Sequence, residues 1–217
     1  MGTPYLVATA RTPIGGFVGA LSALPAPALG ALAVRAAIAR AGVAPEAVEQ
    51  VVMGNVIGAG LGQAPARQAG LGAGVPAAHA ALTVNEVCGS GLKAVALAAQ
   101  AIRLDEADVI AAGGMESMSR APYLLPDVRT GQRLGHGRVV DAMIHDGLWD
   151  PHGDFHMGTA AERCARAHDV SRAAQDAYAA ESYRRAQAAA AAGRFADEIV
   201  VVEVAGRRGP TVVDADE

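Results

Sequence analysis

The segment Val-Asn-Glu-Val-Cys-Gly-Ser-Gly at residues 84–91 joins a short apolar run to a helical pattern. Residues 81–84 are apolar and β-prone, which predicts a strand. Residues 88–103 predict a helix, because apolar side chains recur on one face at helical spacing. The side chains on that face are Leu92, Val95, Ala96, Ala99 and Ile102. The segment therefore predicts a strand that turns directly into a helix at Cys88.

A thiol at the start of a helix is chemically distinctive. The free amides and partial positive charge at a helix N-terminus favour the thiolate, which is the reactive form of cysteine. The same amides can donate to a developing oxyanion. Gly89 and Gly91 remove side chains beside the sulfur, so a substrate carbonyl could approach the backbone. The competing interpretation of Cys88 is a buried structural cysteine at a tight turn.

Strand and helix patterns alternate through the first half of the chain. Further strands are predicted at residues 5–9, at 51–53 with 56–57, and at 108–114, and further helices at 29–42, at Pro45-Glu46 and at 64–71. Such alternation predicts an α/β fold with a mostly parallel sheet. Ligands in such folds bind at the carboxyl ends of the strands.

The second half of the chain has a different character. Residues 115–154 show little periodicity, and loops of that length are usually functional. Two helices are predicted at 159–168 and 171–192, the second capped by Ser171. A strand is predicted at 198–204, and residues 211–213 resemble the start of another.

Composition limits the classes of function. The 217 residues carry a net charge of −4, which argues against a nucleic-acid partner. No apolar run is long enough to span a membrane, and the first residues lack a secretory signal, so we expect a cytoplasmic protein without a membrane partner. Cys88 and Cys164 are best treated as independent thiols. Cys164 lies in the middle of a predicted helix, where inert packing is expected.

Several other kinds of site are not indicated. The cysteines show neither a C-x-x-C pair nor zinc-ligand spacing, so no metal site is predicted. Ser90 lacks the preceding glycine of a G-x-S-x-G elbow. The glycines at 58–60 and 70–72 do not complete a dinucleotide-binding pattern. Cys88 remains the nucleophile that the sequence identifies.

Three segments resemble motifs of the thiolase family. Residues 85–94 (NEVCGSGLKA) resemble its active-site segment, residues 113–119 (GGMESMS) its strand-and-loop motif, and residues 157–162 (MGTAAE) a third motif. The resemblance covers essentially the whole chain and implies a thiolase-like five-layered α-β-α-β-α fold, present as its amino-terminal half with an inserted loop domain. It implies an amino-terminal domain at residues 1–118, an incomplete loop domain at 119–217, and the absence of the carboxyl-terminal domain.

The same resemblance implies site residues and partners. Cys88 would be acylated, with its own amide binding the thioester oxygen, and Leu148, His156 and Met157 would line the pantetheine and acyl pocket. Acyl-CoA and CoA would be substrates, with no metal and no bound cofactor. Residues 120–139 resemble a tetramerisation loop, which implies a homotetramer built as a dimer of dimers.

The implied activity is an acyl-CoA acyltransferase that condenses two acetyl-CoA molecules to acetoacetyl-CoA, or catalyses the reverse thiolysis, by a ping-pong mechanism. A longer-chain 3-ketoacyl-CoA thiolase is the alternative enzyme, although a bulky Met157 favours short chains. The family also uses an activating histidine and a second cysteine that are missing here, so we expect this chain alone to be incomplete for turnover. A catalytically silent half-thiolase acting as a scaffold or subunit is the remaining alternative.

Overall fold

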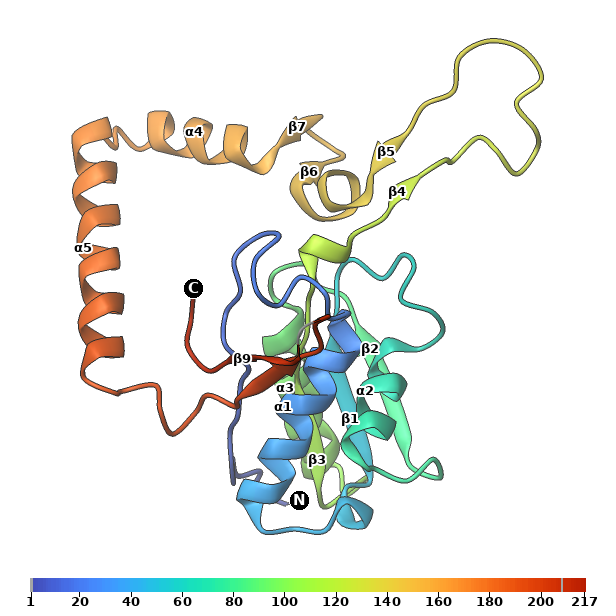
Figure 1. The fold of residues 1–217 in the computed structure, drawn as a ribbon, viewed down its shortest axis with the longest axis vertical. Coiled ribbons are helices and arrows are strands. Elements are labelled where there is room, and N and C mark those ends of the chain that lie inside the picture. The colour runs from blue at the N-terminus through green and yellow to red at the C-terminus, as the bar shows by residue number, and fades with distance from the viewer. Residues whose placement is uncertain (1, 208) are drawn as a thin grey trace.

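A computed structural model describes residues 2–207 and 209–217 and is built around a three-stranded parallel sheet (Figure 1). The strands lie in the order β2 (Ala80–Val84), β1 (Gln50–Gly54) and β3 (Ile110–Gly114). Gly54 pairs with Val84 on one side and with Gly114 on the other. The three carboxyl ends are therefore level, and the predicted parallel arrangement is confirmed for these strands.

Helices cover the two faces of this sheet. On one face, α1 (Ala26–Ala41) and α2 (Pro65–Ala73) form a cluster with Val51 and Met53 of β1. On the other face lies α3 (Ser90–Arg103), whose first turn contacts Gly54. Successive strand residues point to opposite faces of a sheet, so β1 can contact α1 and α2 on one face and α3 on the other. The short 3₁₀ helix η1 (Pro45–Ala47) links α1 to β1.

The amino-terminal strand predicted at residues 5–9 is wrong. The segment has no regular strand structure, and Tyr5, Leu6 and Val7 are each more than 70% exposed. Backbone pairing begins only at Arg11, whose amide donates to Glu198 and whose carbonyl accepts from Val200. A β-prone sequence forms a ladder only when another strand lies beside it, and among the described residues no strand pairs with this segment.

The buried face of α3 also differs from the prediction. Leu92 is 77% exposed, whereas Ala94, Ala98 and Ala101 are buried against the sheet. The helix begins at Ser90, and its first turn lies too close to the strands for a large side chain to fit between them. Small residues therefore occupy the interface, and the larger apolar residues point elsewhere.

After β3 the chain forms short elements. These are η2 (Met118–Arg120), β4 (Tyr123–Leu124), β5 (Val140–Asp141), the π-helical turn η3 (Met143–Leu148), β6 (Trp149–Asp150), β7 (Phe155–His156), α4 (Met157–Ala167) and α5 (Arg172–Ala191). Both helices predicted in this half are confirmed to within two residues. Figure 1 shows α4 and α5 standing away from the sheet, and no residue of either helix is buried.

The last two strands return to the first half of the chain. The antiparallel pair β8 (Val202–Val204) and β9 (Thr211–Val213) packs its apolar side chains against Leu21 and Leu29. The strand predicted at 198–204 is thus shorter than expected, because residues 198–200 pair with Arg11 instead. Among the described residues, no helix is both long enough and apolar enough to cross a membrane.

Ion pairs and hydrogen bonds join the segment that begins at Arg11 to the last residues of the chain. Arg11 makes two hydrogen bonds to Asp216, at 2.6 and 3.0 Å, and one of 2.7 Å to Glu198. Asp216 also accepts from the amide of Ile14, and Glu217 accepts from the amides of Gly16 and Ala20. The loop at residues 12–20 is therefore held by carboxylates from the far end of the sequence.

We expect Asp216→Asn to lower the thermal unfolding midpoint at pH 7 by about 2 to 4 °C. The hydrogen bonds from Arg11 hold the pKa of Asp216 below its ordinary value, so the ionised form stabilises the fold at neutral pH. That contribution is lost as pH falls through the lowered pKa, below about 4. Calorimetry between pH 7 and 2 should show the difference shrinking once the pH falls below about 4, while Asp214→Asn at an exposed position leaves the midpoint unchanged. A difference that stays constant over this whole pH range would contradict the assignment.

Candidate active site

The start of α3 rests directly on the ends of two strands. A Cβ atom added to Gly54 would lie 2.5 Å from the carbonyl carbon of Ser90 and 2.6 Å from the amide nitrogen of Gly91. A Cβ atom on Gly114 would lie 3.2 Å from the Cα of Gly91. Only glycine allows backbones to approach so closely, so these contacts fix where the first turn of the helix sits.

The turn that precedes α3 is strained at Val87. This β-branched residue has a φ of 49°, in the left-handed region that such side chains rarely adopt. The buried Ser90 hydroxyl stabilises the turn, because it donates to the Val87 carbonyl at 2.5 Å and accepts from the Glu86 amide at 2.8 Å. Asn85 adds a third contact by accepting from the Val87 amide at 2.9 Å. Strain of this kind persists only where surrounding contacts impose it, and it is common at active sites.

Cys88 lies in this turn, two residues before the first residue of α3, and it is exposed. It therefore meets the first requirement for a nucleophile, access to a substrate, and the alternative of a buried structural cysteine is wrong. The next two amides, those of Gly89 and Ser90, each donate to a backbone carbonyl of the same turn, Glu86 and Val87 respectively, at 3.1 Å. Cys164 is also exposed, so the expectation that it is packed inside is wrong. Its helix, α4, packs no buried residue against the rest of the described chain.

A half-buried carboxylate follows β3 at the same edge of the sheet. Glu116 accepts hydrogen bonds from the side-chain nitrogen of Asn55 at 2.9 Å and from the amide of Val56 at 2.8 Å. Burial raises the pKa of Glu116 above its ordinary value, although these hydrogen bonds act in the opposite direction. The sequence analysis did not identify Glu116 as a site residue. An acidic residue two positions after a predicted strand, near its carboxyl end, was the available signal.

The predicted pocket residues come together on a hairpin. Leu148 precedes β6. His156 of β7 pairs with Trp149 of β6, and Met157 begins α4. The Nδ1 atom of His156 accepts from the amide of Gly158 at 3.0 Å, so this side chain caps the helix.

This hairpin lies near the carboxyl edge of the sheet (Figure 1). A Cβ atom on Gly147, next to Leu148, would lie 3.5 Å from the side chain of Ile57, which follows β1. The three predicted pocket residues thus lie around one hairpin, at the end of η3, in β7 and at the start of α4, whereas Cys88 lies in the turn between β2 and α3.

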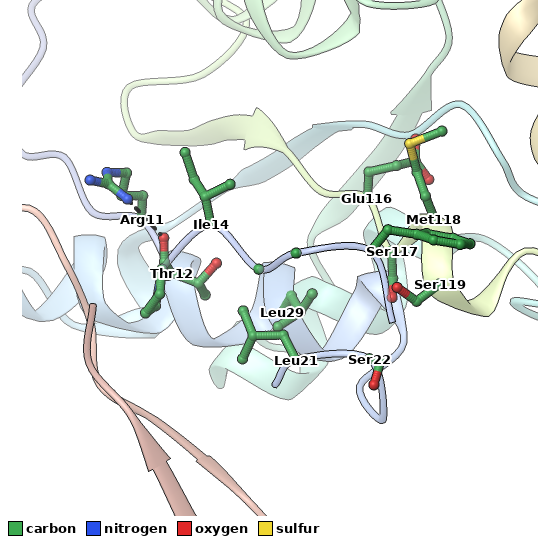
Figure 2. Close-up of a pocket in the computed structure, with 14 residues that line it drawn as sticks. Arg11, Thr12, Ile14, Leu21, Ser22, Leu29, Glu116, Ser117, Met118 and Ser119 are labelled. Carbon is green, nitrogen blue, oxygen red and sulfur yellow. Dashed lines mark hydrogen bonds between the residues drawn. The ribbon is translucent and has the colours of Figure 1, made fainter. Parts of the chain in front are cut away.

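A cavity of about 430 Å³ lies between the loop that begins at Arg11 and the segment after β3. Figure 2 shows Arg11, Thr12 and Ile14 toward one end and Glu116 to Ser119 toward the other, with Leu21 and Leu29 between them. Among the described residues, those that line this cavity do not include Cys88. The cavity therefore adjoins Glu116 rather than the thiol.

Comparison with known proteins agrees with this arrangement. The family described as "Thiolase, N-terminal domain" matches residues 5–217. The chain belongs to this family. Its α/β thiolase-like fold is thereby established, and the resemblance carried by the three motifs is confirmed.

Curated relatives point the same way. The chain is 55% identical over 214 residues to "Acetyl-CoA acetyltransferase 2" of Arabidopsis thaliana, covering 98% of this chain and 53% of the relative. It is 51% identical to "Acetyl-CoA acetyltransferase" of Cupriavidus necator and 50% identical to that of Paracoccus denitrificans, each time covering 98% of this chain and 54% of the relative. This thiolase N-terminal domain therefore spans about half the length of the curated relatives it matches.

The glycine contact beneath Cys88 gives a direct test. Gly54→Ala should lower the free energy of unfolding by about 1 to 3 kcal/mol, because the new methyl group would overlap the backbone of α3. It should also slow the alkylation of Cys88 by iodoacetamide, because the first turn of the helix must move. Gly58→Ala is the matched control, since its methyl group would meet only Asn55 Oδ1, at 3.7 Å. Equal effects of the two substitutions in urea titrations and mass spectrometry would contradict the assignment.

Proposed function

We propose that the protein is an acyl-CoA acyltransferase in which Cys88 is the nucleophile, and that it condenses two acetyl-CoA molecules or catalyses the reverse thiolysis. The observation that carries the proposal is an exposed cysteine in a strained turn at the start of α3. The three relatives described above are named acetyl-CoA acetyltransferases, which supports acetyl-CoA as the substrate. Those names also favour the short-chain activity over the longer-chain alternative.

The first half-reaction transfers an acetyl group to the protein. The Cys88 thiolate attacks the carbonyl carbon of acetyl-CoA, and the bond from that carbon to the CoA sulfur breaks. CoA leaves and takes up a proton to become the thiol. The backbone amide of Cys88 itself is proposed to donate to the oxyanion that forms on the carbonyl oxygen.

The second half-reaction forms the carbon–carbon bond. A second acetyl-CoA loses an α-proton to a base, and its α-carbon attacks the carbonyl of acetyl-Cys88. The bond to the Cys88 sulfur breaks as the new bond forms, which releases acetoacetyl-CoA and regenerates the thiolate. The thioester itself acidifies the α-carbon, so the proposal includes neither a metal nor a bound organic cofactor.

The remaining parts of the proposal concern substrate binding and assembly. Leu148, His156 and Met157 are proposed to contact the pantetheine and acyl groups, within a loop domain at 119–217 that follows an amino-terminal domain at 1–118. A homotetramer is proposed because the loop between β4 and β5 projects from the molecule (Figure 1) and carries exposed apolar side chains. Those side chains are Leu125, Val128, Leu134 and Val139.

Brief exposure of the complete gene product to acetyl-CoA should add one acetyl group to Cys88, detected by intact-mass and peptide mass spectrometry. Cys88→Ala should abolish the labelling, because it removes the nucleophilic sulfur. Cys164→Ala is a matched control at a second exposed cysteine, and it should label at the wild-type level. Labelling that persists in Cys88→Ala would refute the proposed nucleophile.

Substitution of Met157 tests the proposed chain-length preference. Met157 is 40% exposed at the start of α4. If it closes the acyl pocket, Met157→Ala should raise the ratio of kcat/KM for a six-carbon over a four-carbon 3-ketoacyl-CoA by about tenfold. Val170→Ala, at a similarly exposed position beyond α4, should leave the ratio unchanged. An unaltered ratio in Met157→Ala would show that Met157 does not close the acyl pocket.

A further inference from the structure

The carboxyl edge of the sheet is connected by a polar network that centres on Glu116. Both carboxylate oxygens accept hydrogen bonds from the segment that follows β1. Oε1 accepts from Asn55 Nδ2 at 2.9 Å and Oε2 accepts from the Val56 amide at 2.8 Å, and the Ile57 amide lies 3.4 Å from both oxygens. A carboxylate, which only accepts, matches this set of donors.

Asn55 holds Glu116 at a cost to its own hydrogen bonding. Its side-chain nitrogen donates to Glu116 and to the Met115 carbonyl, while its carbonyl oxygen is buried without a hydrogen-bond partner in the described part of the chain. An unsatisfied buried acceptor costs about 1 to 3 kcal/mol. Such an exception in a folded protein calls for an explanation, and a requirement for both donor bonds supplies one.

The segment held by Glu116 contacts the turn that carries Cys88. The Asn55 amide donates to the carbonyl of Val84, the last residue of β2, at 3.0 Å. The side-chain nitrogen of Asn85 reaches the Val56 carbonyl at 3.4 Å, and its oxygen accepts from the Val87 amide at 2.9 Å. Contacts therefore run from Glu116 through Val56 and Asn85 to the strained residue just before the thiol.

We infer that Glu116 is a positioning residue. It holds the segment after β1 against Val84 and Asn85, so that Cys88 stays in its reactive position at the start of α3. The inference rests on the proposed role of Cys88 as the nucleophile. Glu116 touches neither the sulfur nor, in the proposed reaction, the acetyl group. It acts because Val87 would relax toward an ordinary backbone conformation if the contacts around it were loosened.

The opposite end of the sheet offers a matched control. Glu49, next to the first residue of β1, also accepts hydrogen bonds from two consecutive backbone amides, those of Asp108 and Val109. Glu116 thus joins the end of β3 to the segment after β1, and Glu49 joins the start of β1 to the residues just before β3. Glu49, however, lies at the amino edge of the sheet. Its replacement should affect stability without reaching Cys88.

The test compares Glu116→Gln with Glu49→Gln in the complete gene product. Glutamine keeps the size of the side chain but turns one acceptor into a donor that faces other donors. Glu116→Gln should slow the alkylation of Cys88 by iodoacetamide about tenfold, as expected when a reacting group is misplaced by a fraction of an ångström. Alkylation of Cys164 in the same molecule is the internal reference. Glu49→Gln should leave the Cys88 alkylation rate within about twofold of wild type.

Steady-state kinetics provide a second readout. Glu116→Gln should lower kcat by a similar factor and leave KM for acetyl-CoA within about twofold, because the thiol and not the pocket is disturbed. Equal slowing of Cys88 alkylation in both glutamine variants, or wild-type rates in Glu116→Gln, would overturn the inference. If wild-type Cys88 is alkylated by iodoacetamide but never acetylated by acetyl-CoA, the proposed function is refuted. The alkylation rates of the two glutamine variants can still be compared in that case.

A second variant, at an exposed position, tests the same inference if Glu116→Gln does not fold. Asn85→Ala removes the exposed side chain that bridges the Val56 carbonyl and the Val87 amide, and the protein should still fold because the position is at the surface. It should slow Cys88 alkylation several-fold, and the double variant should be no slower than the slower single variant, because both act through one set of contacts. A wild-type rate in Asn85→Ala, or fully multiplicative effects in the double variant, would contradict the assignment.

Discussion

The close contact between Gly54 and the first turn of α3 is the constraint on which the site depends. It allows the helix to sit directly on the carboxyl ends of β1 and β3, and it leaves no room for a side chain between them. The short turn from β2 must therefore reach the helix through a left-handed residue at Val87. The exposure of Cys88 follows from this geometry, because the turn projects from the sheet instead of packing into it.

Polar groups then stabilise what the glycine contacts permit. The Ser90 hydroxyl ties the turn to itself, and Asn85 ties it to the segment after β1. Glu116 joins that segment to the end of β3, so each of the three strands contributes to the position of one thiol. The rigidity of the site therefore comes from a sheet edge where all three carboxyl ends are level, which is a property of the parallel register.

The second half of the chain is organised differently. The helices α4 and α5 bury no residue, and the β4–β5 and β6–β7 hairpins are two residues long on each strand, so little structure holds residues 123–191 together. It nevertheless returns to the sheet domain, through β8 and β9 against α1 and through the carboxylates that hold the loop after Arg11. A segment with so few buried contacts is expected to open locally more readily than the sheet and its helices.

The sequence by itself determined the parallel α/β class, the turn at Cys88 and most helix boundaries, because these follow from local periodicity, capping residues and glycine positions. It also identified the family through three motifs. Tertiary structure alone decided that residues 5–9 form no strand, that alanines rather than Leu92 face the sheet, and that Cys164 is exposed. It likewise decided that Glu116 meets Asn55 and Val56, about sixty residues earlier in the chain. Strand pairing, burial and such contacts depend on which distant segments come together, and no local pattern encodes that information.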